Sequence, residues 1–92
     1  MTTLSLSEIA TRLSTLPAWE VAYGELVRTF SFRDFRAALE FVNRVGEIAE
    51  TAGHHPDIDI RYNKVRLVLV THDTSSLTER DFELAMAISE LG

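Results

Sequence analysis

Hydrophobic and polar positions follow two periods along this chain, one typical of amphipathic helices and one typical of half-buried strands. A first helix is predicted from four apolar residues that recur at spacings of three and four: Leu6, Ile9, Leu13 and Leu16. It begins at Ser5 or Ser7. Ser5 and Glu8 fit a capping box, in which each side chain accepts the backbone N–H of the other residue. Pro17 ends this helix because its ring cannot continue the hydrogen-bond pattern.

Two further helices are predicted from the same period. The longer one begins after an N-cap at Ser31, with Asp34 three residues on, and ends at Gly53, where a left-handed cap fits. Its apolar stripe is Phe35, Leu39, Val42, Val45, Ile48 and Ala52. The last helix begins at Thr78, with Asp81 in the capping-box position, and its apolar side is Phe82, Leu84, Ala85, Ile88 and Leu91.

The strand period predicts two hairpins. They comprise residues 19–22 and 26–30 around a turn at 23–25, and residues 57–62 and 65–71 around a turn at Asn63 and Lys64. One face of the second hairpin then carries apolar side chains at Ile58, Ile60, Tyr62, Val65, Leu67 and Leu69. Val68 and Val70 lie on the other face, covered by a partner subunit or a ligand, or simply exposed near a twisted strand end.

The element order α-β-β-α-β-β-α predicts an α+β fold, a four-stranded antiparallel sheet with three helices packed on one face. At 92 residues, the chain is expected to form a single domain over residues 1–92. Its 46% hydrophobic and 25% charged residues are typical of a globular protein rather than a disordered one.

Charge and composition exclude several classes of function. The net charge is −5, which argues against direct binding of nucleic acid or of an anionic membrane surface. The chain has no cysteine, so disulfides and thiolate catalysis are excluded. The first residues resemble no targeting signal, and the longest apolar run, residues 67–70, is far too short to span a bilayer. We therefore expect a cytoplasmic protein without a membrane segment.

Candidate chemistry centres on the three histidines, whose ordinary pKa suits proton transfer near neutral pH. His54 and His55 directly follow the long helix, and Pro56 stiffens the connection to the next strand. His72 follows the strand that pairs with it, so the hairpin geometry predicts that all three lie at one end of the sheet. A metal site is disfavoured because neighbouring histidines seldom aim both rings at one ion.

Structural roles also account for these residues one by one. Adjacent histidines at a helix C-terminus favour the helix dipole, and a capping box explains Asp81. Glu50 precedes His54 by one helical turn and is close enough to orient its ring, although exposed helical glutamates are common. Trp19 fits either the core or the wall of a pocket.

Four segments together resemble the pterin-4a-carbinolamine dehydratase family. They are Glu50-Thr51-Ala52-Gly53-His54-His55-Pro56, Tyr62-Asn63-Lys64-Val65, Thr71-His72 and Leu77-Thr78-Glu79-Arg80-Asp81. Trp19 and the segment Ser31-Phe32-Arg33-Asp34-Phe35 extend the resemblance over nearly the whole chain. A double histidine with proline, followed by Tyr-Asn-x-Val and a later Thr-His, is far more specific than any of these segments alone.

The resemblance implies a dehydratase that converts 4a-hydroxytetrahydrobiopterin to quinonoid dihydropterin, in the recycling of tetrahydrobiopterin for aromatic amino acid hydroxylases. It implies no metal and no cofactor, and a homodimer or homotetramer. His54 and His72 are then the catalytic acid/base pair. The implied substrate-binding residues are His55, Pro56, Thr71, Asp81 and Trp19, with Glu50 in support.

Departures from the family pattern affect the loop after His72. Ser75-Ser76 stands where members often carry a glycine, so a positive φ at Ser76 would be strained. Two alternatives to this dehydratase remain: a non-catalytic relative that serves as an oligomeric interaction module, and a dehydratase for another pterin. Retention of all three histidines favours catalysis, since an interaction module has no need of clustered imidazoles.

Overall fold

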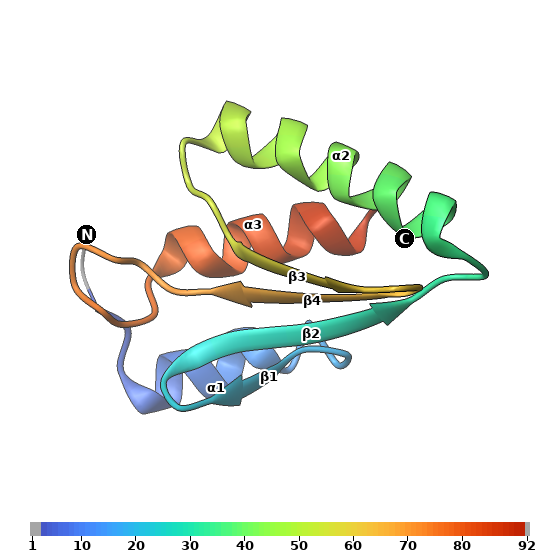
Figure 1. Ribbon diagram of the computed structural model, residues 1–92. Helices are drawn as coiled ribbons and strands as arrows, with labels where there is room; N and C mark the ends of the chain where they lie inside the picture. The colour runs from blue at the N-terminus through green and yellow to red at the C-terminus, as the bar shows by residue number, and fades with distance from the viewer. Residues whose placement is uncertain (1–2, 92) are drawn as a thin grey trace.

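A computed structural model describes residues 3–91 of the chain. It confirms the predicted α+β fold: a four-stranded antiparallel sheet carries three helices on one face (Figure 1). The strand order is β1-β2-β4-β3. No helix within residues 3–91 is long and apolar enough to cross a membrane. The elements are α1 (Leu6–Leu13), β1 (Glu20–Ala22), β2 (Glu25–Ser31), α2 (Phe35–Ala52), β3 (Asp57–Arg61), β4 (Lys64–Leu69) and α3 (Glu79–Ser89).

The predicted cap is confirmed at the start of α1 but not at the start of α2. The prediction that Pro17 ends α1 is also wrong, since the helix ends at Leu13 and Leu16 lies beyond it. Ser5 caps α1, and its capping box with Glu8 is formed in both directions. The predicted cap of α2 at Ser31 is wrong because Ser31 is the last residue of β2 and pairs with Lys64. Asp34 takes that role instead, and its carboxylate accepts the N–H of Ala37 at 2.9 Å.

Both hairpins turn through two residues. Tyr23 and Gly24 close the first, with φ of 54° and 76°, whereas Glu25, predicted in this turn, begins β2 and pairs with Ala22. The second turns through Tyr62 and Asn63, not through Asn63 and Lys64 as predicted, because Tyr62 adopts a φ of 54°. The pairing therefore shifts by two residues. Side chains alternate along a strand with a period of two, so the predicted faces of β3 and β4 are unchanged. Tyr62 is the exception: it was predicted on the apolar face but lies in the turn, where it is exposed.

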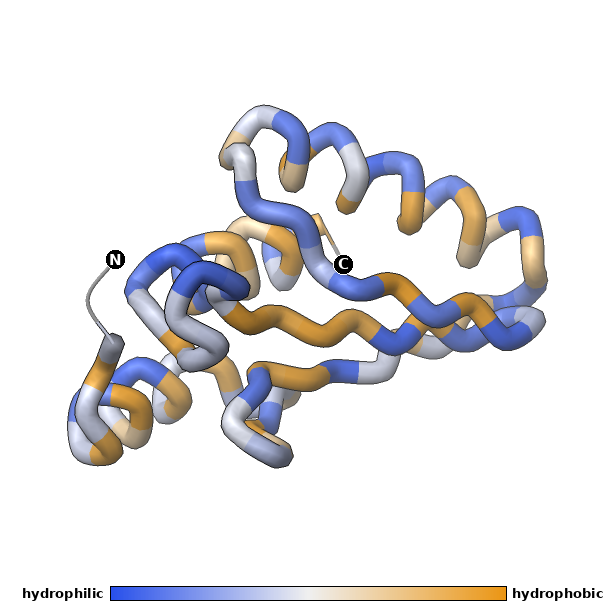
Figure 2. The backbone as a smooth tube through the Cα atoms, turned by 60° about the vertical axis from the view of Figure 1, so that its left-hand side comes forward, coloured by the Kyte–Doolittle hydropathy of each residue, from blue (hydrophilic) through white to orange (hydrophobic). Residues whose placement is uncertain are grey.

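The core lies between the sheet and the helices. Hydrophobic residues alternate with hydrophilic ones along β3, whereas β4 ends in an unbroken hydrophobic run, and α2 turns its hydrophobic residues mainly toward the sheet (Figure 2). The predicted stripe of α2 is partly wrong, since Phe35 and Leu39 are 47% and 38% exposed. The small alanines let α2 approach its neighbours most closely along another line, and its buried residues are Ala38, Phe41, Val45 and Ala49.

The outer face of the sheet differs from both predicted alternatives. Val68 and Val70 are buried within the single chain, so neither a partner subunit nor a ligand is needed to cover them, and neither is exposed. Val68 has Val27 and Asp57 as its neighbours on the two flanking strands. Their side chains shelter it on a strongly paired central strand.

Candidate active site

The three histidines gather around one hollow at the end of the sheet. Pairing of Asp57 with Val68 places the start of β3 beside the end of β4. Gly53, in the left-handed conformation with φ of 64°, ends α2 and turns the chain toward β3. The hollow has a volume of about 380 Å³, and the residues important to its chemistry are His54, His55, Pro56, Thr71, His72 and Arg80.

His54 is held by a buried carboxylate. Its Nε2 lies 2.6 Å from Oδ1 of Asp81, in the first turn of α3. His54 is 6% exposed and Asp81 is fully buried. An ionised carboxylate only accepts hydrogen bonds, so with Asp81 ionised the contact is a hydrogen bond donated by Nε2 of His54. In the neutral imidazole, Nδ1 is then the nitrogen with a lone pair.

Two threonines complete the surroundings of Asp81. Its Oδ2 accepts the hydroxyl proton of Thr71 and the backbone N–H of Thr78, each at 2.9 Å. Because the only hydroxyl proton of Thr71 is used in the hydrogen bond to Asp81, the hydroxyl of Thr78 donates to that of Thr71, at 2.7 Å. Within residues 3–91, no fully buried side-chain nitrogen or oxygen lacks a hydrogen-bond partner. Such buried networks of hydrogen bonds hold their members in one geometry.

His55 and His72 lie in more open surroundings. Nε2 of His55 is 3.1 Å from Oε1 of Glu50, and both side chains are exposed. Glu50 thus contacts His55, whereas the sequence placed it within reach of His54. The exposed His72 ring makes no hydrogen bond within residues 3–91. The hollow therefore combines one rigid imidazole with two that are accessible to a ligand.

Not every residue predicted to bind substrate has free polar atoms at the hollow. Asp81 lies behind His54, and the hydroxyl of Thr71, which lines the hollow, is occupied by Asp81. Trp19 is 3% exposed in the core, and its Nε1–H donates to the hydroxyl of Ser89 at 2.8 Å. Trp19 does not line the hollow.

Three charged residues that line the hollow were not predicted from the sequence: Asp57, Asp73 and Arg80. Arg80 lines the hollow and donates from Nη2 to the carbonyl of Gly53 at 2.6 Å. The signal was its position beside Asp81 in a segment that carries the family resemblance. An arginine in the first turn of a helix otherwise looks like an ordinary exposed charge.

The loop after His72 is closed by two backbone hydrogen bonds. The N–H of Thr71 donates to the carbonyl of Ser76 at 3.0 Å, and the N–H of Ser76 donates back at 3.4 Å. Ser75, not Ser76, adopts the positive φ, at 53°. The strain anticipated from the missing glycine therefore falls one residue earlier.

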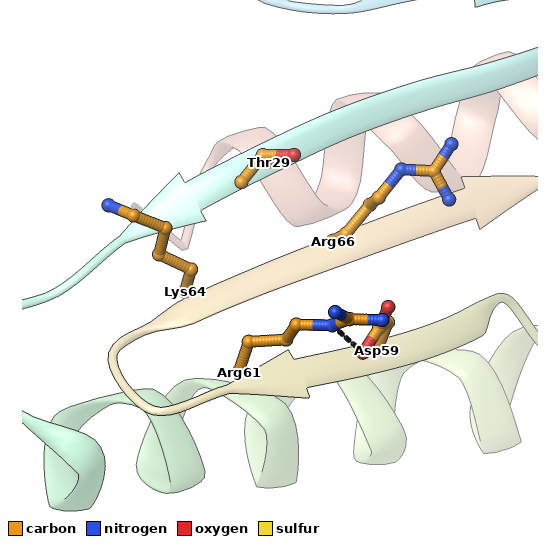
Figure 3. A pocket seen from close by; sticks show the side chains of 5 residues that line it. All are labelled: Thr29, Asp59, Arg61, Lys64 and Arg66. Atoms are coloured by element: carbon orange, nitrogen blue, oxygen red, sulfur yellow. Dashed lines mark hydrogen bonds and ion pairs between the residues drawn. The ribbon is translucent and has the colours of Figure 1, made fainter.

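A second hollow, of about 410 Å³, lies on the open face of the sheet near the β3–β4 turn (Figure 3). Lys64 and Arg66 point away from each other there, and Arg61 turns toward Asp59, 3.4 Å from its Nε. These exposed side chains do not converge on a common point. Within residues 3–91 no cluster of three or more histidine, aspartate or glutamate side chains is arranged to hold a metal ion. Acid–base chemistry thus favours the histidine hollow.

Comparisons with known sequences find relatives along nearly the whole chain. Residues 2–91 match the family model described as pterin 4 alpha carbinolamine dehydratase. A protein of Acidobacterium capsulatum is 59% identical over 91 residues, which cover 99% of each chain. One from Chloroflexus aurantiacus is 56% identical, covering 99% of this chain and 98% of its own. The names of both assign them, provisionally, as pterin-4-alpha-carbinolamine dehydratases.

Solved structures superpose on this chain at lower sequence identity. A transcriptional coactivator/pterin dehydratase from Brucella melitensis superposes with a TM-score of 0.93 at 30% identity, covering 98% of both chains. A pterin dehydratase-like protein identified as a RuBisCO assembly factor in the alpha-carboxysome superposes with a TM-score of 0.65 at 19% identity. It covers 79% of this chain and 84% of its own, and shares the fold.

Proposed function

Since the chain belongs to the pterin 4 alpha carbinolamine dehydratase family, we propose that it dehydrates 4a-hydroxytetrahydrobiopterin to quinonoid dihydropterin by histidine acid–base catalysis. The observation that carries the proposal is the buried pair of His54 and Asp81 at the edge of a hollow that also holds two accessible histidines. A buried histidine–carboxylate pair fixes one imidazole for proton transfer.

The proposed reaction needs two proton transfers. The bond between carbon 4a and its hydroxyl breaks as a proton leaves ring nitrogen 5, a C4a–N5 double bond forms, and the hydroxyl departs as water after gaining a proton. In this proposal Nδ1 of His54 accepts the proton, because Nε2 is committed to Asp81. His72, whose ring is exposed, donates the proton that lets the departing hydroxyl leave as water. His55 binds the substrate, with Glu50 in support.

The wider setting is part of the same proposal. The substrate would come from an aromatic amino acid hydroxylase, so that the enzyme serves tetrahydrobiopterin recycling in the cytoplasm, as a homodimer or homotetramer. A neutral pterin requires no basic pocket, which agrees with the net charge of −5. Sedimentation of the purified protein at several concentrations gives the oligomeric state.

The decisive test forms the 4a-hydroxypterin in place with a hydroxylase and follows the appearance of the quinonoid product. Wild-type protein should accelerate the step, and His54→Ala and His72→Ala should each lower the acceleration by about 10²- to 10⁴-fold. Glu40→Ala, an exposed residue of α2, is the matched control and should retain full activity. Circular dichroism verifies that each variant is folded.

The same assay separates the proposal from its two alternatives. Acceleration with a differently substituted pterin, and none with the biopterin form, would identify a dehydratase for another substrate. No acceleration with any pterin would overturn the enzymatic proposal and favour an interaction module. The names of two structural relatives, a coactivator/dehydratase and an assembly factor, keep that module worth testing.

A further inference from the structure

Two consecutive residues in the first turn of α3 hold two consecutive residues after α2. Arg80 donates from Nη2 to the carbonyl of Gly53 at 2.6 Å, and Asp81 accepts from the ring of His54 at 2.6 Å. Each contact spans 27 residues of sequence. His54 is therefore held on two sides, through its ring and through the peptide group directly before it.

Arg80 suits the Gly53 carbonyl for electrostatic and steric reasons. The last carbonyls of α2 point out of the helix C-terminus, where the helix dipole favours a cation. Gly53 already uses its N–H within the cap, so its carbonyl is the group left to fix. The guanidinium is planar and presents its donors in a rigid fork, unlike the point charge of a lysine. Arg80 makes no ion pair within residues 3–91 that would draw it elsewhere.

The half-buried Arg80 side chain also borders two hollows. It lines the histidine hollow and a smaller one of about 140 Å³, whose walls include Ile48, Ala52 and Leu84 and neither His55 nor His72. His54 borders both hollows as well. Removing the Arg80 side chain would open space on the side of His54 away from the other histidines, so the imidazole could shift backward.

From this geometry we infer that Arg80 is a positioning residue, which holds the peptide before His54 so that the imidazole stays aligned with His72 across the hollow. The inference rests on the proposed dehydratase function. A misplacement of about 1 Å in a catalytic group can cost about 10²-fold in rate. Since only 7% of the His54 side chain is exposed, a small backward shift would withdraw it from a ligand.

The test compares Arg80→Ala and Arg80→Lys with Arg36→Ala, which removes an exposed arginine of α2. We expect Arg80→Ala to lower kcat by about 10- to 100-fold with KM nearly unchanged. Arg80→Lys should fall in between, and added guanidinium ion should restore part of the activity of Arg80→Ala. Arg36→Ala should match the wild type and gain nothing from guanidinium. A rise in KM alone, or no loss of kcat, would overturn the inference.

A second measurement does not depend on catalysis. In ¹⁵N-labelled protein, the ring resonances of His54 should move in Arg80→Ala and in Arg80→Lys, whereas those of His55 should stay in place. Unchanged His54 resonances would overturn the positioning role even if activity fell. If the wild type dehydrates no pterin, the proposed function fails, while displaced His54 resonances would still show that Arg80 positions this ring.

Discussion

The carboxylate of Asp81 and the imidazole of His54 lie 2.6 Å apart in the interior, although 27 positions separate them along the chain. A capping role and a role in the candidate active site therefore meet in one side chain. Oδ2 of Asp81 accepts the N–H of Thr78 at the start of α3, while Oδ1 accepts the proton of His54. Substitutions at Asp81 should consequently affect stability and catalysis together.

Asp81→Asn should keep the fold but lower kcat by about 10²-fold or more, because an amide that donates to His54 would reverse the ring's protonated and free nitrogens. Asp81→Ala should lower the free energy of unfolding by about 3–5 kcal/mol, since it leaves buried donors without an acceptor. Urea denaturation and steady-state kinetics measure the two effects. Wild-type kcat in Asp81→Asn would contradict the proposed role of His54.

Thr71→Val should lower the free energy of unfolding by about 1–3 kcal/mol, because it removes a donor to Asp81 and leaves the hydroxyl of Thr78 without its acceptor. Valine has almost the same shape as threonine, so the packing around position 71 changes little. Thr29→Val, on the exposed face of β2, is the matched control and should change stability little. Equal unfolding midpoints for all three proteins would show that the buried network adds nothing to stability.

Trp19→Phe should lower the free energy of unfolding by about 1–3 kcal/mol, since the hydrogen bond to Ser89 is lost and the smaller ring leaves space in the core. Because Trp19 does not line the histidine hollow, kcat and KM for the pterin should remain at their wild-type values. Thermal unfolding and steady-state kinetics give both quantities. A raised KM would instead support the substrate contact that the family resemblance implies for Trp19.

The free energy of unfolding should depend on pH through Glu8, the exposed carboxylate in the capping box of α1. Hydrogen bonds from the backbone and side chain of Ser5 lower the pKa of Glu8 below its ordinary value of 4.5. A lowered folded-state pKa stabilises the fold above the unfolded value and loses this contribution as pH falls through the folded value. Glu8→Gln keeps the accepting oxygen but not the charge.

The melting temperature of wild-type protein should therefore exceed that of Glu8→Gln at neutral pH, by a small margin because Glu8 is exposed. The margin should close as the pH falls below 4.5. Melting curves recorded from pH 7 to pH 3 check this. A margin that widens on acidification would mean that the charge of Glu8 does not favour the folded state.

Sequence patterns were most informative where local chemistry decides the structure. Ser5, Gly53 and Thr78 mark helix ends by their own hydrogen-bonding or backbone preferences, and each lies where predicted. The prediction of a helix cap at Ser31 was wrong because serine suits both a helix cap and a strand, and the pairing of β2 with β4 decides between them. The second turn was predicted one residue too late, because a positive φ is uncommon in tyrosine and Tyr62 adopts one here.

The candidate site was predictable in composition but not in its contacts. Turn and strand lengths were enough to place His54, His55 and His72 at one end of the sheet. The pairing of Asp81 with His54 depends on how α3 packs against the end of α2, and that of Glu50 with His55 on the path of the chain after α2. That packing is a tertiary property, and no spacing along the chain encodes it. Arg80 was missed for the same reason.

When the ribosome synthesises this chain, the contacts of α3 can form only at the end. The residues that pair with His54 and Gly53 leave the ribosome after every strand of the sheet has been made. Until α3 docks, the imidazole of His54 has neither its carboxylate partner nor a fixed backbone. Proton-transfer competence should thus be the last property that the growing chain acquires, and the first that it loses when its final helix detaches.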